Sequence, residues 1–377
     1  MNKKRKPLEL YVHIPFCIRK CAYCDFVSGP GTKAMQEAYE AALTAEIAAA
    51  ETAPESEVVT VFFGGGTPSA VDAGMLSRVM EVLRKKYVFS ENAEITLEAN
   101  PGTLDEEKLK CYRDSGFNRI SMGCQSVHDA ELKRLGRIHT FAQFQESFAL
   151  ARKAGFNNIN VDLMSGLPGQ SEESWEESLR TIAALSPEHI SAYSLIVEPG
   201  TTFAEQELDL PDEDTEREMY ARTVEILAEY GFSQYEISNY AKAGCACRHN
   251  IGYWKRTDYF GFGPSAASLF ENRRWTNTGE VSSYLEAGGA PKKIREDEEK
   301  LSRQDRIEEF MFLGLRMTEG ISETEFEEQF GEEIHAVYGD VLAKYEKMQM
   351  LEERGGRLTL TREGISVSNV ILADFLL

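Results

Sequence analysis

Hydrophobic positions follow two alternating spacings over the first 240 residues. Short apolar segments rich in β-branched and aromatic residues predict strands, and the longer segments between them carry apolar residues at helical spacing. The predicted strands are 8–14, 58–63, 94–99, 118–122, 159–164 and 189–197, followed by a short one at 232–237. The predicted helices are 33–51, 73–87, 105–115, 128–154, 172–185 and 213–230.

Six strand–helix units in a row indicate an α/β fold with a parallel sheet and helices outside it. Glycine, proline and asparagine cluster after the strands rather than before them. In barrels, the loops at the carboxyl ends of the strands form the active face. We therefore expect an incomplete parallel (β/α)6 TIM-like barrel over 1–240, with one open side.

The alternation stops after residue 240. We expect 241–304 to be a connecting segment rich in glycine and aromatic residues, irregular over 244–290 and ending in a charged linker or helix start over 291–305. The last part, 305–377, predicts a small, mostly helical, winged-helix-like domain. Its expected elements are a helix near 306–316, acidic helices over 322–350 and a strand-like end at 358–361.

Composition narrows the classes of function. Among 377 residues, 41 are Lys or Arg and 62 are Asp or Glu, which gives a formal net charge of −21. That excess of acid argues against nucleic acid as a partner, because phosphates require cationic groups. There is no apolar run of about 18 residues and no apolar signal-peptide core, so we expect a cytoplasmic protein.

Three of the seven cysteines are crowded into eight residues. Cys17, Cys21 and Cys24 form C-x3-C-x2-C in the loop after the first predicted strand. Three thiolates at this spacing can ligate three corners of a [4Fe–4S] cluster and leave the fourth iron open for a small molecule. The alternatives are a zinc site, for which His13 is a candidate fourth ligand, and three ordinary buried thiols.

The whole chain resembles a known family. The segments YVHIPFCIRKCAYCDF, FFGGGTPS, ITLEANPG, ISMGCQS, LGRIH and INVDLMSGLPGQ resemble the radical S-adenosylmethionine (radical SAM) superfamily. Within it they are similar to the branch that contains oxygen-independent coproporphyrinogen III dehydrogenase and the HemW-type heme chaperones. The resemblance implies a [4Fe–4S] cluster on the three cysteines and bound S-adenosylmethionine.

Residues that follow the predicted strands fit a bound cofactor. A glycine run lets the backbone approach a ligand, an arginine can clamp a carboxylate, and an acid inside an apolar strand needs a partner. In the family pattern, the positions that match S-adenosylmethionine contacts are Tyr11, Gly65, Gly66, Thr67, Glu98, Gln125, Arg137 and Asp162. Cys111 and Cys124 are interpreted as structural.

The segment from 245 to 256 distinguishes the heme chaperones from the coproporphyrinogen III dehydrogenase. His249, Asn250, Tyr253 and Trp254 match the HNxxYW pattern of the heme chaperones, which implies heme contact, with His249 as a candidate axial ligand. Imidazole ligates heme iron and flat aromatic rings can pack on a porphyrin. Arg248, Lys255 and Arg256 are candidate partners for the propionates, and Cys245 and Cys247 have no counterpart in the family pattern.

Two departures speak against the dehydrogenase. Its signature has a further cysteine two residues past the triad, where this chain has Phe26, and only 16 residues precede Cys17. The resemblance therefore implies a heme chaperone that delivers heme to acceptor hemoproteins, membrane-bound ones among the candidates, and that takes electrons from a donor. A dehydrogenase that decarboxylates propionates and a radical SAM methyltransferase stay open as alternatives, as does the question whether S-adenosylmethionine is cleaved.

Overall fold

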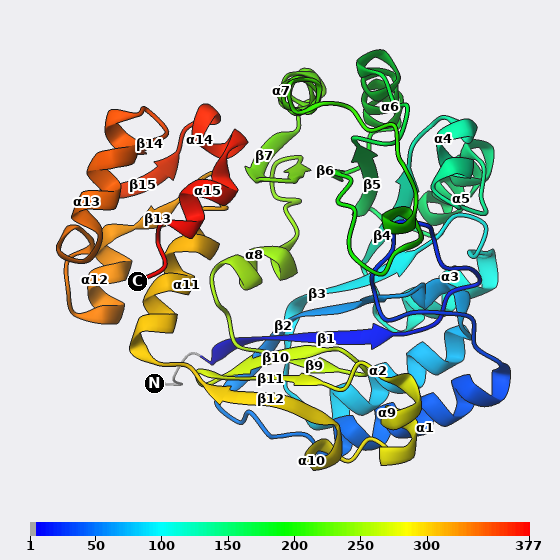
Figure 1. Cartoon of the computed structure of the whole chain (residues 1–377). Coiled ribbons are helices and arrows are strands. Elements are labelled where there is room, and N and C mark those ends of the chain that lie inside the picture. Colours follow the sequence, from blue (N-terminus) through cyan, green and yellow to red (C-terminus); the bar gives the residue numbers. More distant parts are fainter. Residues whose placement is uncertain (1–4) are drawn as a thin grey trace.

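The computed structural model describes residues 5–377, and six parallel strands form its centre (Figure 1). Neighbouring strands pair in the order β1 to β6, each parallel to the next. Their bounds are β1 Lys6–Ile14, β2 Ser56–Gly65, β3 Phe89–Ala99, β4 Arg119–Gln125, β5 Ile159–Ser165 and β6 His189–Ser194. The predicted parallel βα series is confirmed.

Helices cover the outer face of this sheet. They are α1 Lys33–Ala49, α2 Ala73–Lys86, α3 Glu106–Asp114, α4 Asp129–Arg134, α5 Phe141–Lys153, α6 Glu172–Ala184 and α7 Glu213–Glu229, with short 3-10 turns η1 Pro68–Ala70 and η2 Thr202–Glu205. Side-chain caps fix several starts; at α5, Thr140 and Gln143 form a capping box, which satisfies two backbone N–H groups that the first turn leaves free.

The alternation of side chains along each strand makes the two faces chemically different. On β1, Leu8, Leu10 and Val12 are buried in the main hydrophobic core. The intervening residues Glu9 and His13 are also buried but point to the other face, the interior of the partial barrel. The same alternation on the other strands gives the interior an unusually polar lining of buried acids, amides and histidines.

Further strands extend the sheet at both edges, and apart from β9, which is parallel to β1, each pairs antiparallel to its neighbours. The order at one edge is β6-β8-β7 and at the other β1-β9-β10-β11-β12. The added strands are β7 Ser233–Glu236, β8 Asn239–Ala241, β9 Tyr259–Phe262, β10 Ala267–Phe270, β11 Arg273–Asn277 and β12 Arg295–Lys300. Helices α8 Arg248–Trp254, α9 Val281–Ala287 and α10 Pro291–Ile294 lie between them.

Two expectations for this part of the chain are wrong. The segment 244–290 is not irregular, because β9 pairs parallel to β1 and β10 and β11 continue the sheet. For 291–305 the helix start is confirmed, by α10 and by a helix that begins at Arg303, but the linker is wrong, since β12 pairs with β11. The alternation signal fails here because these strands are only four to six residues long. The domain boundaries at 240 and 304 stay predictions.

A second, separate hydrophobic core lies in the C-terminal part of the chain and includes Ile307, Phe326, Tyr338 and Leu358. Its helices are α11 Arg303–Gly314, α12 Glu323–Phe330, α13 Ile334–Lys347, α14 Arg362–Ser366 and α15 Ser368–Ala373. Its three-stranded antiparallel sheet has the order β13-β15-β14, with β13 Ile321–Ser322, β14 Leu351–Glu353 and β15 Arg357–Leu360. A mostly helical domain with a small sheet agrees with the prediction.

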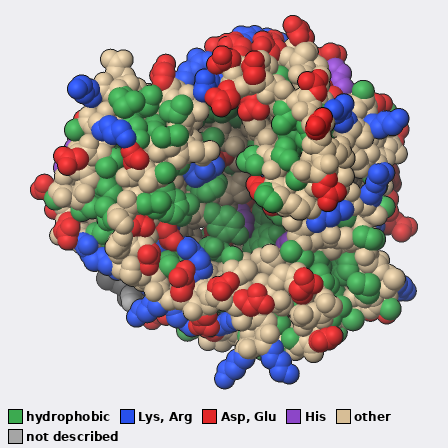
Figure 2. Space-filling model, in the orientation of Figure 1, with side chains coloured by type: hydrophobic (Ala, Val, Ile, Leu, Met, Phe, Trp, Pro, Cys, Tyr) green, Lys and Arg blue, Asp and Glu red, His purple; other side chains and the backbone are tan. Residues whose placement is uncertain are grey.

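Helix α8 lies between the C-terminal domain and the parallel strands (Figure 1). The surface of this side is hollowed at its centre, with charged side chains on the rim and hydrophobic and histidine side chains inside (Figure 2). Among residues 5–377, no helix combines the length and the apolar character that crossing a bilayer requires.

Candidate functional site

The cysteine loop stands at the carboxyl end of β1. A bridge between Phe16 and Gly29 closes the loop, with the N–H of Cys17 donating to the Gly29 carbonyl over 2.9 Å. Inside it, the N–H of Cys24 donates to the carbonyl of Cys21. All three thiols of the motif are half-buried and line one cavity of about 140 Å³ at the mouth of the barrel. The fold therefore presents the three sulfurs to a single enclosed space.

Seven of the eight residues predicted to contact S-adenosylmethionine line this same cavity. They are Gly65, Gly66, Thr67, Glu98, Gln125, Arg137 and Asp162, contributed by β2 to β5 and by the loop after α4. Tyr11 does not line it; its hydroxyl lies 3.0 Å from Nδ1 of His13, and its ring stacks on Phe62. The carboxyl ends of parallel strands meet at one edge, which brings these distant residues together.

The glycines of the run have a packing role besides any contact with a ligand. Gly65 has φ of +103°, and a Cβ there would overlap the His13 ring. A Cβ on Gly66 would lie 2.7 Å from the carbonyl oxygens of Ile14 and Phe16. The loop after β2 therefore packs directly against the start of the cysteine loop, and only glycine permits that approach.

Thr67 and Arg137 connect the cysteines to the cavity wall. Oγ1 of Thr67 lies 3.3 Å from Sγ of Cys17 and accepts a 2.8 Å hydrogen bond from Asn100. Arg137 directs Nη1 at Sγ of Cys21 over 3.7 Å and donates from Nη2 to Asn100 and to the carbonyl of Gly123. Its Nε is buried and has no partner within the described chain, so one donor of this guanidinium is free to meet a ligand.

Two buried acids complete the cavity. Glu98 accepts a 3.1 Å hydrogen bond from the N–H of Gly65, and Asp162 accepts one of 2.6 Å from Asn160. Burial, followed by repulsion from Asp162, raises the pKa of Glu98 to about 8. Burial also raises the pKa of Asp162. Carboxyl groups whose charged form is disfavoured this strongly favour a cationic or hydroxyl-bearing ligand.

The backbone at the end of β4 is strained. Gln125 has φ of +70°, in the left-handed region that non-glycine residues seldom occupy, and the strand register shifts between Gly123 and Gln125. Its side-chain oxygen accepts a 2.9 Å hydrogen bond from the Tyr193 hydroxyl. Strain of this kind persists where surrounding contacts hold it, often beside functional sites.

The donor set fits a cluster better than a single ion. A zinc ion with bonds of about 2.3 Å would hold its sulfur ligands about 3.8 Å apart. Within residues 5–377, the cysteine sulfurs do not form a group of three ligand atoms within 4.8 Å of one another. His13, the candidate fourth zinc ligand, has both ring nitrogens in contact, with Tyr11 and with the Val27 carbonyl. Three cysteines without a free fourth ligand suit a cluster with one open iron better than a closed zinc site.

The predicted heme motif lies deeper in the barrel interior, away from the cysteine loop, against Thr60 and Glu94 in the middle of β2 and β3. Helix α8 places its first N–H groups against the Glu94 carboxylate, which accepts from the backbone of Arg248 and of His249 at 3.2 and 3.3 Å. The imidazole of His249 lies inside the barrel and is 2% exposed. Its Nδ1 is 2.7 Å from Oγ1 of Thr60 and its Nε2 is 3.0 Å from the Tyr253 hydroxyl.

Comparison with known proteins decides the family. The radical SAM superfamily model matches residues 11–182 and the HemN C-terminal domain model matches 301–367. The heme chaperone HemW of Lactococcus lactis is 37% identical over 99% of this chain and 98% of its own length. HemW of Bacillus subtilis is 37% identical over 97% of this chain and 98% of its own. The chain belongs to the HemW family of radical SAM proteins.

A solved structure supports the same assignment. Coproporphyrinogen III oxidase (HemN) from Escherichia coli, described as a radical SAM enzyme, superposes with a TM-score of 0.85. It is 25% identical in sequence, and the match covers 99% of this chain and 91% of that one. The radical SAM family implies a [4Fe–4S] cluster and S-adenosylmethionine, and the cavity at Cys17, Cys21 and Cys24 has the donors to hold both.

The HNxxYW motif of the HemW family is divided between two environments. His249 and Tyr253 face the barrel interior, whereas Trp254 lines a groove between α8 and the C-terminal domain. This groove has a volume of about 460 Å³. Its walls are Trp254, Lys255, Arg256, Phe310, Gly314, Met317, Gly320, Ile321, Glu325, Glu328, Gln329 and Arg357.

The other predicted cationic and cysteine residues are mostly engaged. Arg256 forms a buried ion pair of 2.7 Å with Glu309, Lys255 pairs with Glu319 at 2.6 Å, and Arg248 donates to the Asn92 carbonyl. Sγ of Cys247 contacts Glu94, and burial raises the pKa of this thiol to about 12. A thiol that stays protonated is a poor metal ligand, so Cys247 serves as the cap residue of α8.

Three remaining cysteines have separate surroundings. Cys245 is half-buried and directs its sulfur at the Ala243 carbonyl. Cys124 is fully buried behind the cavity and contacts the Ser126 carbonyl, and Cys111 on α3 lies 3.1 Å from the Ser77 hydroxyl. These contacts agree with the structural role predicted for Cys111 and Cys124.

Several cavity residues escaped the sequence analysis. They are Tyr23, Asn100, Ser121, Gly123 and Tyr193. Asn100 follows directly after a predicted strand, in the same position as Gly64 after its own strand, and that signal was available. Tyr193 gave no such signal, because its role depends on β6 placing its hydroxyl against Gln125.

Proposed function

We propose that this protein is a heme chaperone that holds a [4Fe–4S] cluster and S-adenosylmethionine in the mouth of its barrel and delivers bound heme to acceptor hemoproteins. The observation that carries the proposal is the groove beside Trp254. It joins aromatic and apolar side chains to cations, and it adjoins a radical SAM barrel whose near full-length relatives are named heme chaperones.

The groove offers heme two kinds of contact. The rings of Trp254 and Phe310 and the thioether of Met317 provide apolar surface for a flat macrocycle. Lys255, Arg256 and Arg357 are the cations of the groove's wall. To meet the heme carboxylates, Lys255 would have to leave Glu319 and Arg256 would have to leave Glu309. A volume near 460 Å³ lies in the range of pockets for ligands of this class, about 300–1,000 Å³.

Heme contact by His249, Asn250 and Tyr253 remains a prediction, and for His249 it requires breaking hydrogen bonds that the structure shows. To ligate iron, the His249 ring would have to leave Thr60 and Tyr253 and become accessible from the groove side. Burial lowers the pKa of His249 to about 3, so the imidazole is neutral and chemically able to ligate. Contact through Trp254 requires no such rearrangement.

In the mouth, the chain's own residues bind and orient the small cofactor. We assign Arg137 and the Gly65–Thr67 backbone to its amino-acid part, and Glu98 and Asp162 to its cationic and hydroxyl groups. When bound, the cluster would be able to supply one electron for cleavage of the sulfonium bond. Formation of 5′-deoxyadenosine in the incubation described below separates cleavage from a role as a ligand only.

A second candidate function is oxidative decarboxylation of coproporphyrinogen III. It is favoured by the similarity in fold to Escherichia coli HemN over almost the whole chain. Against it stands Phe26, two residues past the cysteine triad, whose side chain is 60% exposed and lines the cavity where the dehydrogenase signature has a further cysteine.

One sample tests both functions. The protein is reconstituted without oxygen, and one portion is titrated with hemin while another is incubated with coproporphyrinogen III, reductant and S-adenosylmethionine. We expect saturable hemin binding, transfer to an apo-hemoprotein and no protoporphyrinogen. Clear turnover of the porphyrinogen without hemin transfer would establish the dehydrogenase instead. We further propose that the chain works in the cytoplasm with a separate electron donor.

A further inference from the structure

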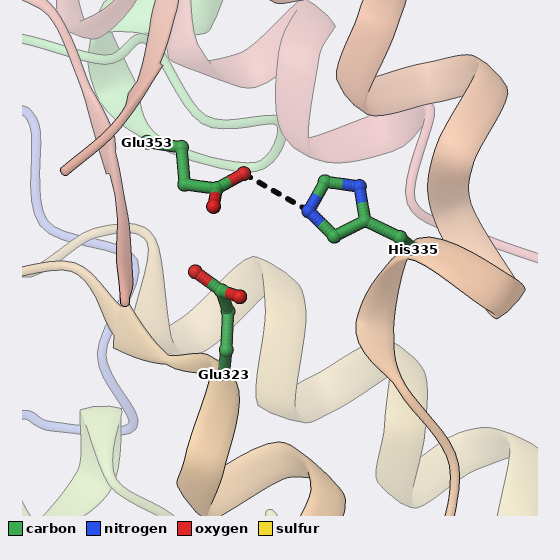
Figure 3. Close-up of side chains that lie close together, drawn as sticks. All are labelled: Glu323, His335 and Glu353. Atoms are coloured by element: carbon green, nitrogen blue, oxygen red, sulfur yellow. Dashed lines mark hydrogen bonds and ion pairs between the residues drawn. The ribbon is translucent and has the colours of Figure 1, made fainter. Parts of the chain in front are cut away.

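Three metal-ligating side chains converge on the surface of the C-terminal domain, remote in sequence from the cysteine loop (Figure 3). Glu323 begins α12, His335 lies in the first turn of α13 and Glu353 ends β14. One ligand atom from each lies within 4.8 Å of the other two, and within residues 5–377 this is the one such group. The closest pair is Nε2 of His335 and Oε2 of Glu353, 2.9 Å apart.

The elements that carry these side chains are fixed by the domain's own core. Phe326, Ile334 and Leu351 are buried in it, within three residues of Glu323, His335 and Glu353 respectively. β14 is paired with β15 along its length. Sites built on packed helices and strands hold their geometry better than sites on free loops, so the convergence is a property of the fold.

The charges of the group are not balanced within the described chain. Its two carboxylates face one imidazole, and none of the ion pairs of residues 5–377 joins a lysine or arginine to Glu323 or Glu353. One oxygen of Glu323, Oε1, is buried and has no hydrogen-bond partner. An unpartnered buried acceptor beside a second carboxylate is an arrangement that a bound cation would satisfy.

We propose that Glu323, His335 and Glu353 form a binding site for a divalent first-row transition-metal ion of the zinc or manganese class. One imidazole nitrogen with two carboxylates is a ligand set that such ions accept, and three protein ligands leave a position for water or for a partner's side chain. Around an ion with bonds of about 2.0–2.2 Å, the donors must approach to about 3.4 Å. The side chains of His335 and Glu353 are 46% and 37% exposed, so they have room to rotate inward.

The bound ion would join α12, α13 and β14 at one point. Because only the folded domain assembles the three donors, binding stabilises that domain, and the stabilisation grows with the logarithm of ion concentration above the dissociation constant. The rest of the chain offers a matched control. His128 and Glu177 form another surface histidine–glutamate pair, 3.7 Å apart, without a second carboxylate in a donor group.

The test is a titration of the full chain with ZnCl₂, followed by calorimetry, in a background carrying Cys17→Ser, Cys21→Ser and Cys24→Ser so that the barrel thiols take no zinc. MnCl₂ followed by electron paramagnetic resonance on the unsubstituted chain gives a second reading, because manganese prefers oxygen and nitrogen to thiolate. We expect one equivalent of each ion to bind and to raise the midpoint of thermal unfolding.

Variants assign the site. Glu323→Gln keeps the size of the side chain and removes its charge, and His335→Gln removes the imidazole; each should weaken ion binding at least tenfold and abolish the shift in midpoint. His128→Gln should change neither. Ion binding that is unaltered by Glu323→Gln and His335→Gln, or a wild-type chain that binds neither ion at millimolar concentration, would overturn the proposal and leave an ordinary surface ion pair.

Discussion

Two regions of the barrel bury ionisable side chains on the same strands but leave them in opposite conditions. At the mouth, Glu98, Asp162 and Arg137 line a cavity, and Nε of Arg137 has no partner in the described chain. Beside α8, Glu94 accepts hydrogen bonds from two N–H groups of that helix, and both nitrogens of His249 are engaged. These groups are available for a ligand at the mouth and engaged beside α8, although Oε2 of Glu9 and Nε of Arg119 in the interior also lack a partner in the described chain.

The comparison also explains why two equally distinctive motifs behave differently. The cysteine motif sits in a loop whose thiols all turn to one cavity. The HNxxYW motif lies on a seven-residue helix, so its side chains spread around the axis. His249 and Tyr253 therefore hold the helix against the strands, while Trp254 reaches the groove.

Removing the three cysteines of the motif should have the largest effect, which is the loss of bound iron. A triple Cys17→Ala, Cys21→Ala, Cys24→Ala variant, reconstituted without oxygen, should lose essentially all of about four irons per chain. Its free energy of unfolding should change little, because the thiols are half-exposed and carry no core packing. Iron and sulfide analysis with urea unfolding measures both. Retained iron in the variant would contradict the assignment of the mouth.

Glu94→Ala should destabilise the fold by about 2–4 kcal/mol, because it leaves two N–H groups of α8 without an acceptor and Arg119 without a nearby buried charge. The matched variant at the mouth, Glu98→Gln, should cost about 1 kcal/mol or less, since Glu98 is protonated at neutral pH and accepts from a single N–H. Urea unfolding compares them. Equal losses of unfolding free energy in the two variants would contradict the proposed difference between the mouth and the region of the barrel beside α8.

Trp254→Ala should weaken hemin binding about tenfold, or about 1.4 kcal/mol, with partial recovery in Trp254→Phe. His249→Ala should mainly lower the free energy of unfolding, because the hydroxyls of Thr60 and Tyr253 lose their hydrogen-bond partner. Hemin titration and unfolding are measured on the same preparations. Complete loss of hemin binding in His249→Ala with an unchanged free energy of unfolding would instead make the interior imidazole the heme ligand.

The last prediction concerns the pH dependence of stability. Burial raises the pKa of Glu9 from 4.5 to about 9, and burial lowers that of His249, so their 3.8 Å contact joins two neutral groups rather than an ion pair. Glu9 is protonated in the folded state and ionised in the unfolded state between these values. Its contribution to stability is complete below pH 4.5 and is lost as pH rises toward 9.

Stability should therefore fall between pH 6.5 and 8, by at most about 1.4 kcal/mol per pH unit for this one group. Glu9→Gln, which cannot ionise, should make that slope shallower, while Glu98→Gln reports the same effect from the mouth. Urea unfolding at the two pH values gives the slopes. An unchanged slope in Glu9→Gln would show that Glu9 is ionised in the fold.

The sequence alone determined the repeated βα units and the cysteine motif, and the resemblance to radical SAM proteins supplied seven of the residues that line the mouth. The reason is physical: parallel strands put their carboxyl ends at one edge, so residues such as Gly65, Glu98 and Asp162 must meet once the strands are located. The sequence could not show the strands from β9 to β12, because their pairing depends on distant partners rather than on local spacing.

Only the tertiary structure decided what α8 does. Nothing in local pattern links His249 to Thr60, 189 residues away, or Glu94 to the first turn of α8. The same holds for Glu323, His335 and Glu353, which are brought together by the packing of two helices and a strand. Local sequence specifies which chemistry a side chain carries, whereas burial and long-range packing specify whether that chemistry is free to bind or is already used to hold the fold.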